Sequence, residues 1–340
     1  MTKIEWTEAT WNPIVGCTIA TPGCTNCYAM RAAWRMSHNP ATPQYHGTVK
    51  MVNGNPVWTG KMALVEKVLA APLHRKKPTT YFVNSMGDLF HEDVPDEWID
   101  RVFAVMALCP QHRFQILTKR SARMREYVAA DRRDEMNAIA GTLAAWSDMD
   151  EHVSWPLNNV WLGVSVEDQR RADERIPDLL STPAAIRFVS AEPLLGPVNL
   201  TRTNSENEVM INALTGEGGW PVPHVVGGPA LDWVIGGGES GRGARPMHPD
   251  WARDIRDQCV AAGVPQFFKQ WGAWLPSSHA GHLGDEVDDC ALGEWHDNGK
   301  DWILSCMCRE GDADMPMFRV GKRAAGRLLD GREWSEMPNA

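Results

Sequence analysis

The stretch Gly16-Cys17-Thr18-Ile19-Ala20-Thr21-Pro22-Gly23-Cys24-Thr25-Asn26-Cys27-Tyr28 holds three cysteines in one short loop, with the spacing C-x6-C-x2-C. Two glycines and a proline bend this loop. A turn-rich loop can direct three thiolates toward one centre, whereas the side chains of a helix or strand of this length point to several faces. Converging thiolates bind soft metal ions or iron–sulfur clusters. The loop therefore predicts a metal or cluster site.

The 340 residues have the composition of a soluble globular protein, with 43% hydrophobic and 23% charged residues. The net charge of -9 gives no overall basic signature for nucleic-acid binding, but it does not exclude a local basic groove. No apolar run approaches the roughly 18 residues that span a membrane, and the N-terminus does not resemble a signal peptide. We therefore expect a cytoplasmic protein with no membrane partner, whose cysteines are thiols, ligands or catalysts rather than disulfides.

Apolar strands alternate with helical segments along most of the chain. Strands are predicted at 4–16, 79–84, 114–118, 160–166, 186–190, 232–236 and 264–269, and helices at 28–36, 62–73, 97–108, 122–129, 169–180 and 250–262. Strands that are apolar throughout predict a parallel sheet buried on both faces. About seven such units favour a complete or partial (β/α) barrel over an open sheet.

The rest of the chain departs from this alternation. Residues 38–60 are rich in proline, glycine and asparagine and are predicted to be a loop. We expect the barrel to occupy residues 1–272, with insertions near 131–158 and 201–230. Residues 273–340 are predicted to form a C-terminal extension that closes the barrel mouth, with a helical segment at 321–329.

Polar side chains follow each predicted strand at its C-terminal end, which is the catalytic rim of a barrel. They are the three cysteines, Ser85 and Asp88, Thr118 to Arg120, Ser165 and Glu167, Ser190 and Glu192, Glu239 and Ser240, and Lys269 and Gln270. The alternative interpretation is that solvent and helix caps begin where strands end. Cations at one rim, such as Lys119, Arg120 and Lys269, would suit an anionic substrate.

Two kinds of site fit three cysteines. A structural zinc ion takes four ligands, and the loop holds no fourth cysteine or histidine; the next candidates are His38 and His46. A 4Fe–4S cluster bound by three cysteines keeps one iron open for a substrate or cofactor. The residues of the loop leave both sites open.

A three-cysteine loop after the first strand of a (β/α) barrel, with an aromatic residue beside the last cysteine, resembles the radical S-adenosylmethionine enzymes. The resemblance implies a 4Fe–4S cluster on Cys17, Cys24 and Cys27, whose open iron binds S-adenosylmethionine, and a 5′-deoxyadenosyl radical as the reactive species. The spacing departs from the common C-x3-C-x2-C pattern, in which the aromatic residue precedes the last cysteine; here Tyr28 follows Cys27. The turn Pro22-Gly23 can direct the additional residues outward.

The chain also resembles a phage-associated family of uncharacterised three-cysteine proteins that is described as radical-SAM-like. The matching stretches run nearly end to end: 2–7, 11–13, 23–29, 163–167, 190–194, 236–241, 267–272 and 326–331. A more distant resemblance is to radical SAM enzymes of the spore photoproduct lyase type. These resemblances imply a flavodoxin- or ferredoxin-like electron donor and an action on a nucleobase in DNA or RNA, by modification or lyase-like repair.

The resemblance further implies cofactor-binding roles at the strand ends. Asp88 and the turn that begins at Ser85 would accept hydrogen bonds from the cofactor's amino group. Ser165 and Glu167 would bind its ribose hydroxyls or its carboxylate. Gly237, Gly238 and Glu239 form a glycine-rich turn whose backbone would approach the adenine or the substrate closely, and Glu192 completes the set.

Two alternatives come from other classes of protein. One is a zinc-stabilised nucleic-acid-binding protein without catalysis, and the other is a phage accessory protein with a structural cluster. Neither the catalytic residues nor the oligomeric state follows from the sequence. The cysteines outside the loop have no assigned role, and those of the C-terminal extension, with His282 or His296, are candidates for an auxiliary metal site. They are Cys109, Cys259, Cys290, Cys306 and Cys308.

Overall fold

The computed structural model describes residues 4–143, 154–204, 210–218, 227–282, 291–295, 302–305 and 315–338. The chain divides into two compact units. The first contains Met1–Ser165 and Arg175–Phe188, and the second contains Val166–Glu174 and Val189–Ala340. Helix α6 (Gln169–Ser181) begins in the second unit and ends in the first.

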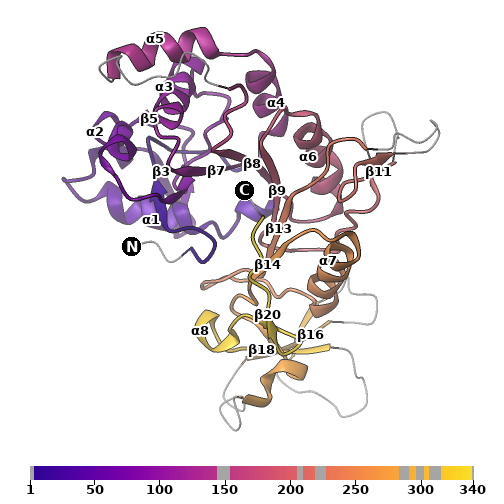
Figure 1. The fold of residues 1–340 in the computed structure, drawn as a ribbon. Coiled ribbons are helices and arrows are strands. Elements are labelled where there is room, and N and C mark those ends of the chain that lie inside the picture. The colour runs from indigo at the N-terminus through magenta and orange to yellow at the C-terminus, as the bar shows by residue number, and fades with distance from the viewer. Residues whose placement is uncertain are drawn as a thin grey trace. The chain divides into compact units, whose positions relative to one another are not determined.

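The main sheet is a seven-stranded sheet whose strand order follows the chain (Figure 1). Its strands are β1 (Ala9–Trp11), β6 (Thr80–Val83), β7 (Arg113–Thr118), β8 (Val160–Ser165), β9 (Ile186–Ala191), β13 (Trp233–Gly237) and β14 (Gln266–Gln270). The pairs β1–β6, β6–β7, β7–β8 and β13–β14 are parallel. A chain-ordered parallel sheet lacks the reversal that defines a doubly wound sheet and is compatible with a partial (β/α) barrel. The predicted α/β class is therefore confirmed.

The first unit contains helices α3 (Asp96–Ala107), α4 (Ser121–Ala129) and α5 (Arg133–Leu143). Helix α3 buries Ile99, Val102, Phe103 and Met106, whose spacing places them on one face. Burial of side chains of this size contributes about 1.5–3 kcal/mol each relative to exposure. Packing of this apolar face fixes α3, and it thereby holds the turn between the end of β6 and α3 in place.

The segment after the cysteine loop differs from the prediction. Helix α1 (Tyr28–Ser37) agrees with it, but the predicted loop at 38–60 contains a short helix, η2 (Pro43–Tyr45), and a β-hairpin of β3 (Val49–Val52) and β4 (Asn55–Trp58). The predicted helix at 62–73 is also wrong. Its first residues form strand β5 (Ala63–Leu64), which pairs antiparallel with β2 (Ile14–Val15), and only the short helices α2 (Glu66–Leu69) and η3 (Ala71–His74) follow.

The second unit contains helix α7 (Pro249–Ala262), which begins with a proline at its first position and ends at Gly263 with a left-handed backbone (φ 69°). A small sheet of β10 (Thr203–Asn204), β11 (Met210–Asn212) and β12 (Glu217–Gly218) lies in the predicted insertion at 201–230. A four-stranded antiparallel sheet consists of β15 (Leu275–Pro276), β16 (Ala291–Trp295), β17 (Trp302–Ser305) and β18 (Met315–Arg319). This unit therefore adds antiparallel structure to the end of the parallel sheet.

The helical segment predicted at 321–329 is shorter than expected. Helix α8 (Lys322–Ala325) is followed by a hairpin of β19 (Leu328–Leu329) and β20 (Arg332–Glu333). The division of the chain into a barrel up to residue 272 and an extension that closes its mouth stays a prediction. None of the helices in the described parts of the chain is long and apolar enough to cross a membrane.

Candidate metal centre

The cysteine loop begins at a position that only glycine can occupy. Gly16 has a positive φ of 104°, and a Cβ atom there would lie 2.1 Å from the carbonyl oxygen of Lys61. Its amide donates a hydrogen bond of 3.1 Å to the carbonyl oxygen of Met86 in the turn after β6. The start of the loop is therefore held between two segments of the first unit.

Short turns bring the cysteines toward one another. Cys24 ends the helix η1 (Pro22–Cys24), and the amide of Cys27 donates to the carbonyl oxygen of Cys24 at 3.1 Å. Cys27 directly precedes α1, at the positive end of that helix. Cys17 and Cys27 both pack against one apolar cluster of the first unit. The loop thus has a buried side that carries its thiols.

The thiols interact electrostatically. The pKa of Cys17 is raised to about 12, mainly by burial and then by Asp88 and the other two cysteines, while Arg120 acts in the opposite direction. Burial also raises the pKa of Cys27, which Cys24 raises as well. The effects of Cys24 on the other two thiols, and of Cys27 on Cys17, indicate that the three thiols lie near one another. Metal binding there would displace their protons, as it does at any thiolate site.

Cationic and dipolar groups surround the thiols. The backbone amides of Ala29 and Met30, in the first turn of α1, lower the pKa of Cys27, and Lys119 lowers it too. The Nη1 atom of Arg120 lies 3.7 Å from the Sγ atom of Cys17. Positive groups of this kind stabilise thiolates and the negative clusters that thiolates bind. They come from the end of β7 and the start of α1.

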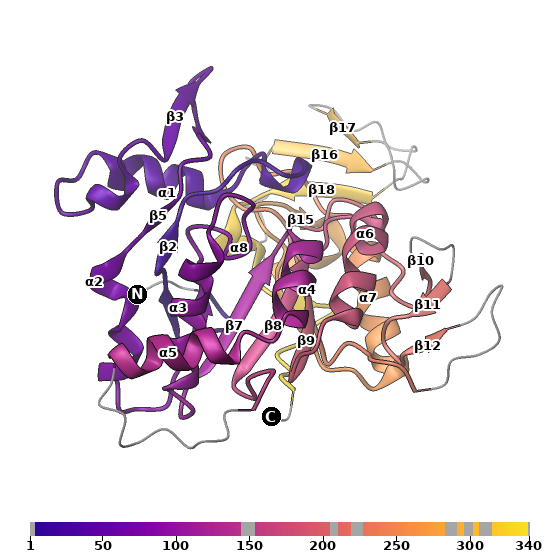
Figure 2. The same cartoon turned by 90° about the horizontal axis from the view of Figure 1, so that it is seen from above.

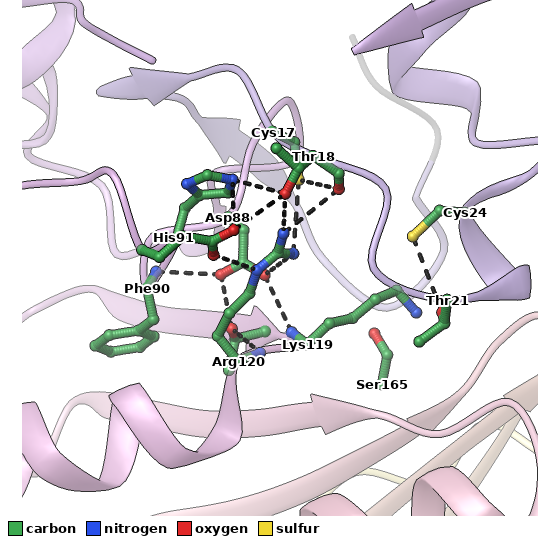
Figure 3. Close-up of polar contacts among 12 residues, drawn as sticks. Cys17, Thr18, Thr21, Cys24, Asp88, Phe90, His91, Lys119, Arg120 and Ser165 are labelled. Carbon is green, nitrogen blue, oxygen red and sulfur yellow. Dashed lines mark hydrogen bonds and ion pairs between the residues drawn. The ribbon is translucent and has the colours of Figure 1, made fainter. Parts of the chain in front are cut away.

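Asp88 is the buried carboxylate that organises the end of β7 (Figure 3). Its Oδ1 atom accepts hydrogen bonds from the hydroxyl of Thr118 (2.6 Å) and the amide of Phe90 (3.1 Å). Its Oδ2 atom accepts from the amide of Lys119 (3.0 Å) and from Nη1 of Arg120 (3.1 Å). Asp88 therefore binds the guanidinium of Arg120 directly and the backbone of Lys119 beside it.

Arg120 connects this carboxylate to the cysteine loop. Its Nη2 atom donates to the hydroxyl of Thr18 at 2.6 Å, and its Nε atom donates to Glu92 at 3.3 Å. The same hydroxyl lies 2.8 Å from Nε2 of His91, whose ring is fully buried. Burial lowers the pKa of His91, and Arg120 lowers it further, so the imidazole is neutral at pH 7. Hydrogen bonds from Arg120 and with His91 therefore hold Thr18, the residue next to Cys17.

Ser85 is also engaged by neighbouring residues. Its hydroxyl donates to the Oδ1 atom of Asn12 at 3.1 Å. Its carbonyl oxygen accepts a hydrogen bond of 2.9 Å from the hydroxyl of Tyr28, the aromatic residue beside the last cysteine. Tyr28 therefore joins the start of α1 to the turn after β6, which is a role that the sequence did not indicate. Ser165 lies in the first unit as well, and its carbonyl oxygen accepts from Arg175 at 2.6 Å.

The remaining predicted site residues lie in the second unit. Glu192 forms an ion pair of 3.1 Å with Lys269 and accepts a hydrogen bond of 3.3 Å from the hydroxyl of Ser190. Glu167 is buried, with an exposed fraction of 1%. These strand ends therefore carry a buried acidic group and a half-buried ion pair.

Arg245 binds both carboxylate oxygens of Glu239. Nε and Nη2 of Arg245 donate to these two oxygens at 2.8 and 2.6 Å, and the backbone amide of Arg245 donates to the same carboxylate at 2.9 Å. Bidentate arginine–carboxylate pairs are strong and geometrically specific. The pair closes the glycine-rich turn after β13 into a fixed loop.

The sequence matches, over residues 1–338, a family model described as a protein of unknown function (DUF5131). The chain belongs to this family. No curated protein and no solved structure matches it.

Zinc and an iron–sulfur cluster place different geometric demands on the cysteines of this DUF5131 chain. Zinc binds sulfur at about 2.3 Å and would draw its ligand atoms together around one point. No three His, Cys, Asp or Glu side chains among the described residues are grouped in this way. His38 follows the last residue of α1, a ten-residue helix that begins after Cys27, and the two residues are thus separated by about 15 Å along the helix. In a cluster, each cysteine binds a different iron atom, so the three thiols stand further apart.

The glycine-rich turn yields the first testable prediction. A Cβ atom at Gly238 would lie 2.0 Å from the carbonyl oxygen of Trp271, whereas one at Gly236 would meet nothing within 4 Å. We expect Gly238→Ala to lower the free energy of unfolding by about 1–3 kcal/mol, because backbone cannot yield as a flexible side chain does. Gly236→Ala is the matched control and should change it by less than about 0.5 kcal/mol. Urea denaturation of both variants measures these changes. Equal free energies of unfolding for the two variants would contradict the close contact between Gly238 and the carbonyl oxygen of Trp271.

Proposed function

We propose that the protein is a radical S-adenosylmethionine enzyme in which Cys17, Cys24 and Cys27 bind a 4Fe–4S cluster. The observation that carries the proposal is the set of three interacting thiols on one loop, with two cations beside them. Cys109 is the other cysteine described in the first unit, and burial alone raises its pKa, with no effect from the loop thiols. The donor set therefore offers three thiolates, which is the set that keeps one iron open.

A cluster held by Cys17, Cys24 and Cys27 would supply one-electron reductive cleavage of S-adenosylmethionine to methionine and a 5′-deoxyadenosyl radical, with the electron provided by a flavodoxin- or ferredoxin-like donor. The residues of the chain hold the site for this chemistry. The apolar cluster behind Cys17 and Cys27 limits access of water to that side of the loop. Arg120 and Lys119 place positive charge beside the thiolates. Asp88 binds the guanidinium of Arg120 and the backbone amide of Lys119.

The cofactor-binding roles of the other strand ends belong to the same proposal. Asp88 already accepts four hydrogen bonds from the chain, so it would bind the cofactor's amino group only by sharing oxygens with these donors. Glu192, beside Lys269, offers a carboxylate to ribose hydroxyls. The predicted set is Ser85, Asp88, Ser165, Glu167, Glu192, Gly237, Gly238 and Glu239. The proposed substrate is a nucleobase in DNA or RNA, which would be modified or repaired in the manner of a photoproduct lyase.

Anaerobic reconstitution tests the proposed reaction. The chain is purified anaerobically, incubated with iron and sulfide, reduced with dithionite and mixed with S-adenosylmethionine. We expect a brown protein with the visible absorption of a 4Fe–4S cluster, and 5′-deoxyadenosine as a product detected by liquid chromatography and mass spectrometry. Stoichiometric zinc without uptake of iron would refute the proposal and favour a zinc-stabilised protein without catalysis.

A further inference from the structure

Positive charge is concentrated in residues 28–77, which we call the basic segment. It contains eight lysines and arginines and one carboxylate, in a chain whose net charge is -9. The cations are Arg31, Arg35, Lys50, Lys61, Lys67, Arg75, Lys76 and Lys77. Strong charge asymmetry within one chain is the electrostatic footprint of a surface that binds a polyanion.

The one carboxylate of the basic segment is neutralised. Glu66 accepts two hydrogen bonds from the guanidinium of Arg101 in α3, at 2.6 and 2.5 Å. The bidentate pair commits both oxygens of Glu66, and the charges of Arg101 and Glu66 cancel. The surface therefore presents cations without a competing anion of its own.

The cations of the basic segment are exposed, except for the half-exposed Arg31. Five of them make no side-chain hydrogen bond or ion pair with any residue that the structure describes: Arg31, Arg35, Lys50, Lys76 and Lys77. Arginines elsewhere, such as Arg132, Arg170 and Arg253, pair with carboxylates. Charges without an internal partner are available to an external one.

The basic segment and the cysteine loop are built on the same core. The apolar cluster contains Ala29 and Met30 of α1, Val49 of β3 and Trp58 of β4, and Cys17 and Cys27 pack against it. Lys61 and Lys67 donate to the carbonyl oxygens of His46 and Ala41, which fixes the intervening loop. A polyanion bound to the cations of α1 and the β3–β4 hairpin would therefore lie next to the cysteine loop.

The β3–β4 hairpin projects beyond α1 (Figure 2). Its turn is Asn53-Gly54, and both residues have positive φ values (48° and 76°), as a two-residue hairpin turn requires. Met51 and Val52, beside Lys50, are 44% and 41% exposed although they are apolar. A two-stranded ribbon fits the major groove of B-form DNA, which is about 12 Å wide. The major groove of A-form RNA is too deep and narrow for it.

We propose that the basic segment is a docking surface for duplex DNA, with its cations on the phosphates and the tip of the β3–β4 hairpin in the groove. This inference rests on the nucleic-acid substrate of the proposed function and narrows it to duplex DNA. Binding itself requires neither the cluster nor the cofactor, so it can be measured independently of catalysis.

The test is fluorescence anisotropy of a labelled DNA duplex titrated with the full chain between about 50 and 200 mM salt. We expect Arg35→Ala/Lys50→Ala to raise Kd about tenfold or more, and to reduce the slope of log K against log salt by about 2, which corresponds to two lost phosphate contacts. Arg170→Ala/Arg332→Ala removes two exposed cations outside the segment and is the matched control. An equal effect of both double variants would overturn the proposal.

The hairpin tip is tested with Met51→Ser/Val52→Ser. We expect weaker DNA binding with an unchanged salt slope, because apolar contacts in a groove release no counterions. RNA duplex of the same sequence and phosphatidylserine vesicles serve as competitors. Equal affinity for the RNA duplex, or binding to the vesicles but not to DNA, would overturn the proposal.

The results for docking and for catalysis are distinguishable. A chain that releases 5′-deoxyadenosine but does not bind the DNA duplex would contradict the docking surface alone. A chain that binds the duplex through the basic segment but takes up no iron would contradict the proposed enzyme and leave the docking surface in place.

Discussion

Replacement of Cys24 by alanine is expected to abolish assembly of the 4Fe–4S cluster. Cys24 is buried, and its carbonyl oxygen accepts the amide of Cys27, so the two thiols belong to one tight turn. Each thiolate of a cluster site binds a separate iron atom, and the loss of one leaves two irons without protein ligands. Iron and sulfide contents after reconstitution should fall from about four of each per chain to near zero.

Cys109→Ala is the control for this variant. Cys109 is fully buried at the end of α3, and its side chain is as inaccessible as that of a loop cysteine. Because the loop thiols do not affect its pKa, we expect this variant to keep a complete cluster. Both variants should retain the wild-type far-UV circular dichroism spectrum. A complete cluster in Cys24→Ala would contradict the assignment of the ligands.

The strand predicted at 4–16 is divided in the structure between β1 and β2, and β2 pairs antiparallel with β5. The parallel strands from β6 onward were predictable because their signal is local. Each is a short, mainly apolar run bounded by polar or turn residues. For a strand that is buried on both faces, such a run is sufficient to predict the strand. The predicted helix at 62–73 failed because a distant pairing outweighs helix propensity: Ala63 and Leu64 pair with β2, some fifty residues earlier. Pro72 then begins a separate short helix.

The hairpin in the basic segment was missed although its signal was present. Asn53-Gly54 lies between Val49–Val52 and Asn55–Trp58, and an Asn-Gly pair between apolar runs favours a hairpin turn. The surrounding prolines and glycines suggested a loop because such composition is typical of irregular structure. The turn dipeptide was therefore more informative than the composition of the segment.

The cysteines were predictable as a group, but the network that surrounds them was not. Asp88 and Arg120 were both predicted at strand ends, yet their pairing depends on β6 and β7 being neighbours in the sheet. Thr18 and His91 were not predicted, since a hydroxyl beside a cysteine and a histidine after a turn have no distinctive spacing. Their contact exists only because the loop and the turn are held together at Gly16.

Replacement of Asp88 by alanine is expected to lower the free energy of unfolding by about 3–5 kcal/mol, the cost of breaking a buried ion pair. The side chains of Asp88 and Arg120 are 6% and 12% exposed. Without the carboxylate, the guanidinium of Arg120 keeps only its contacts with Thr18, the exposed Glu92 and Cys17, and the hydroxyl of Thr118 and two backbone amides lose their acceptor. Equilibrium denaturation by urea measures the loss.

Glu66→Ala is the matched control, because it removes a carboxylate that also binds one arginine through short hydrogen bonds. The side chain of Glu66 is 64% exposed, so Arg101 can regain hydration, and the expected loss is only about 0–1 kcal/mol. Similar losses in the two variants would show that the Asp88–Arg120 pair behaves as a surface pair. The cluster provides a second measurement: because Asp88 positions the cation nearest Cys17, Asp88→Ala should hold less iron than Glu66→Ala at temperatures where both are folded.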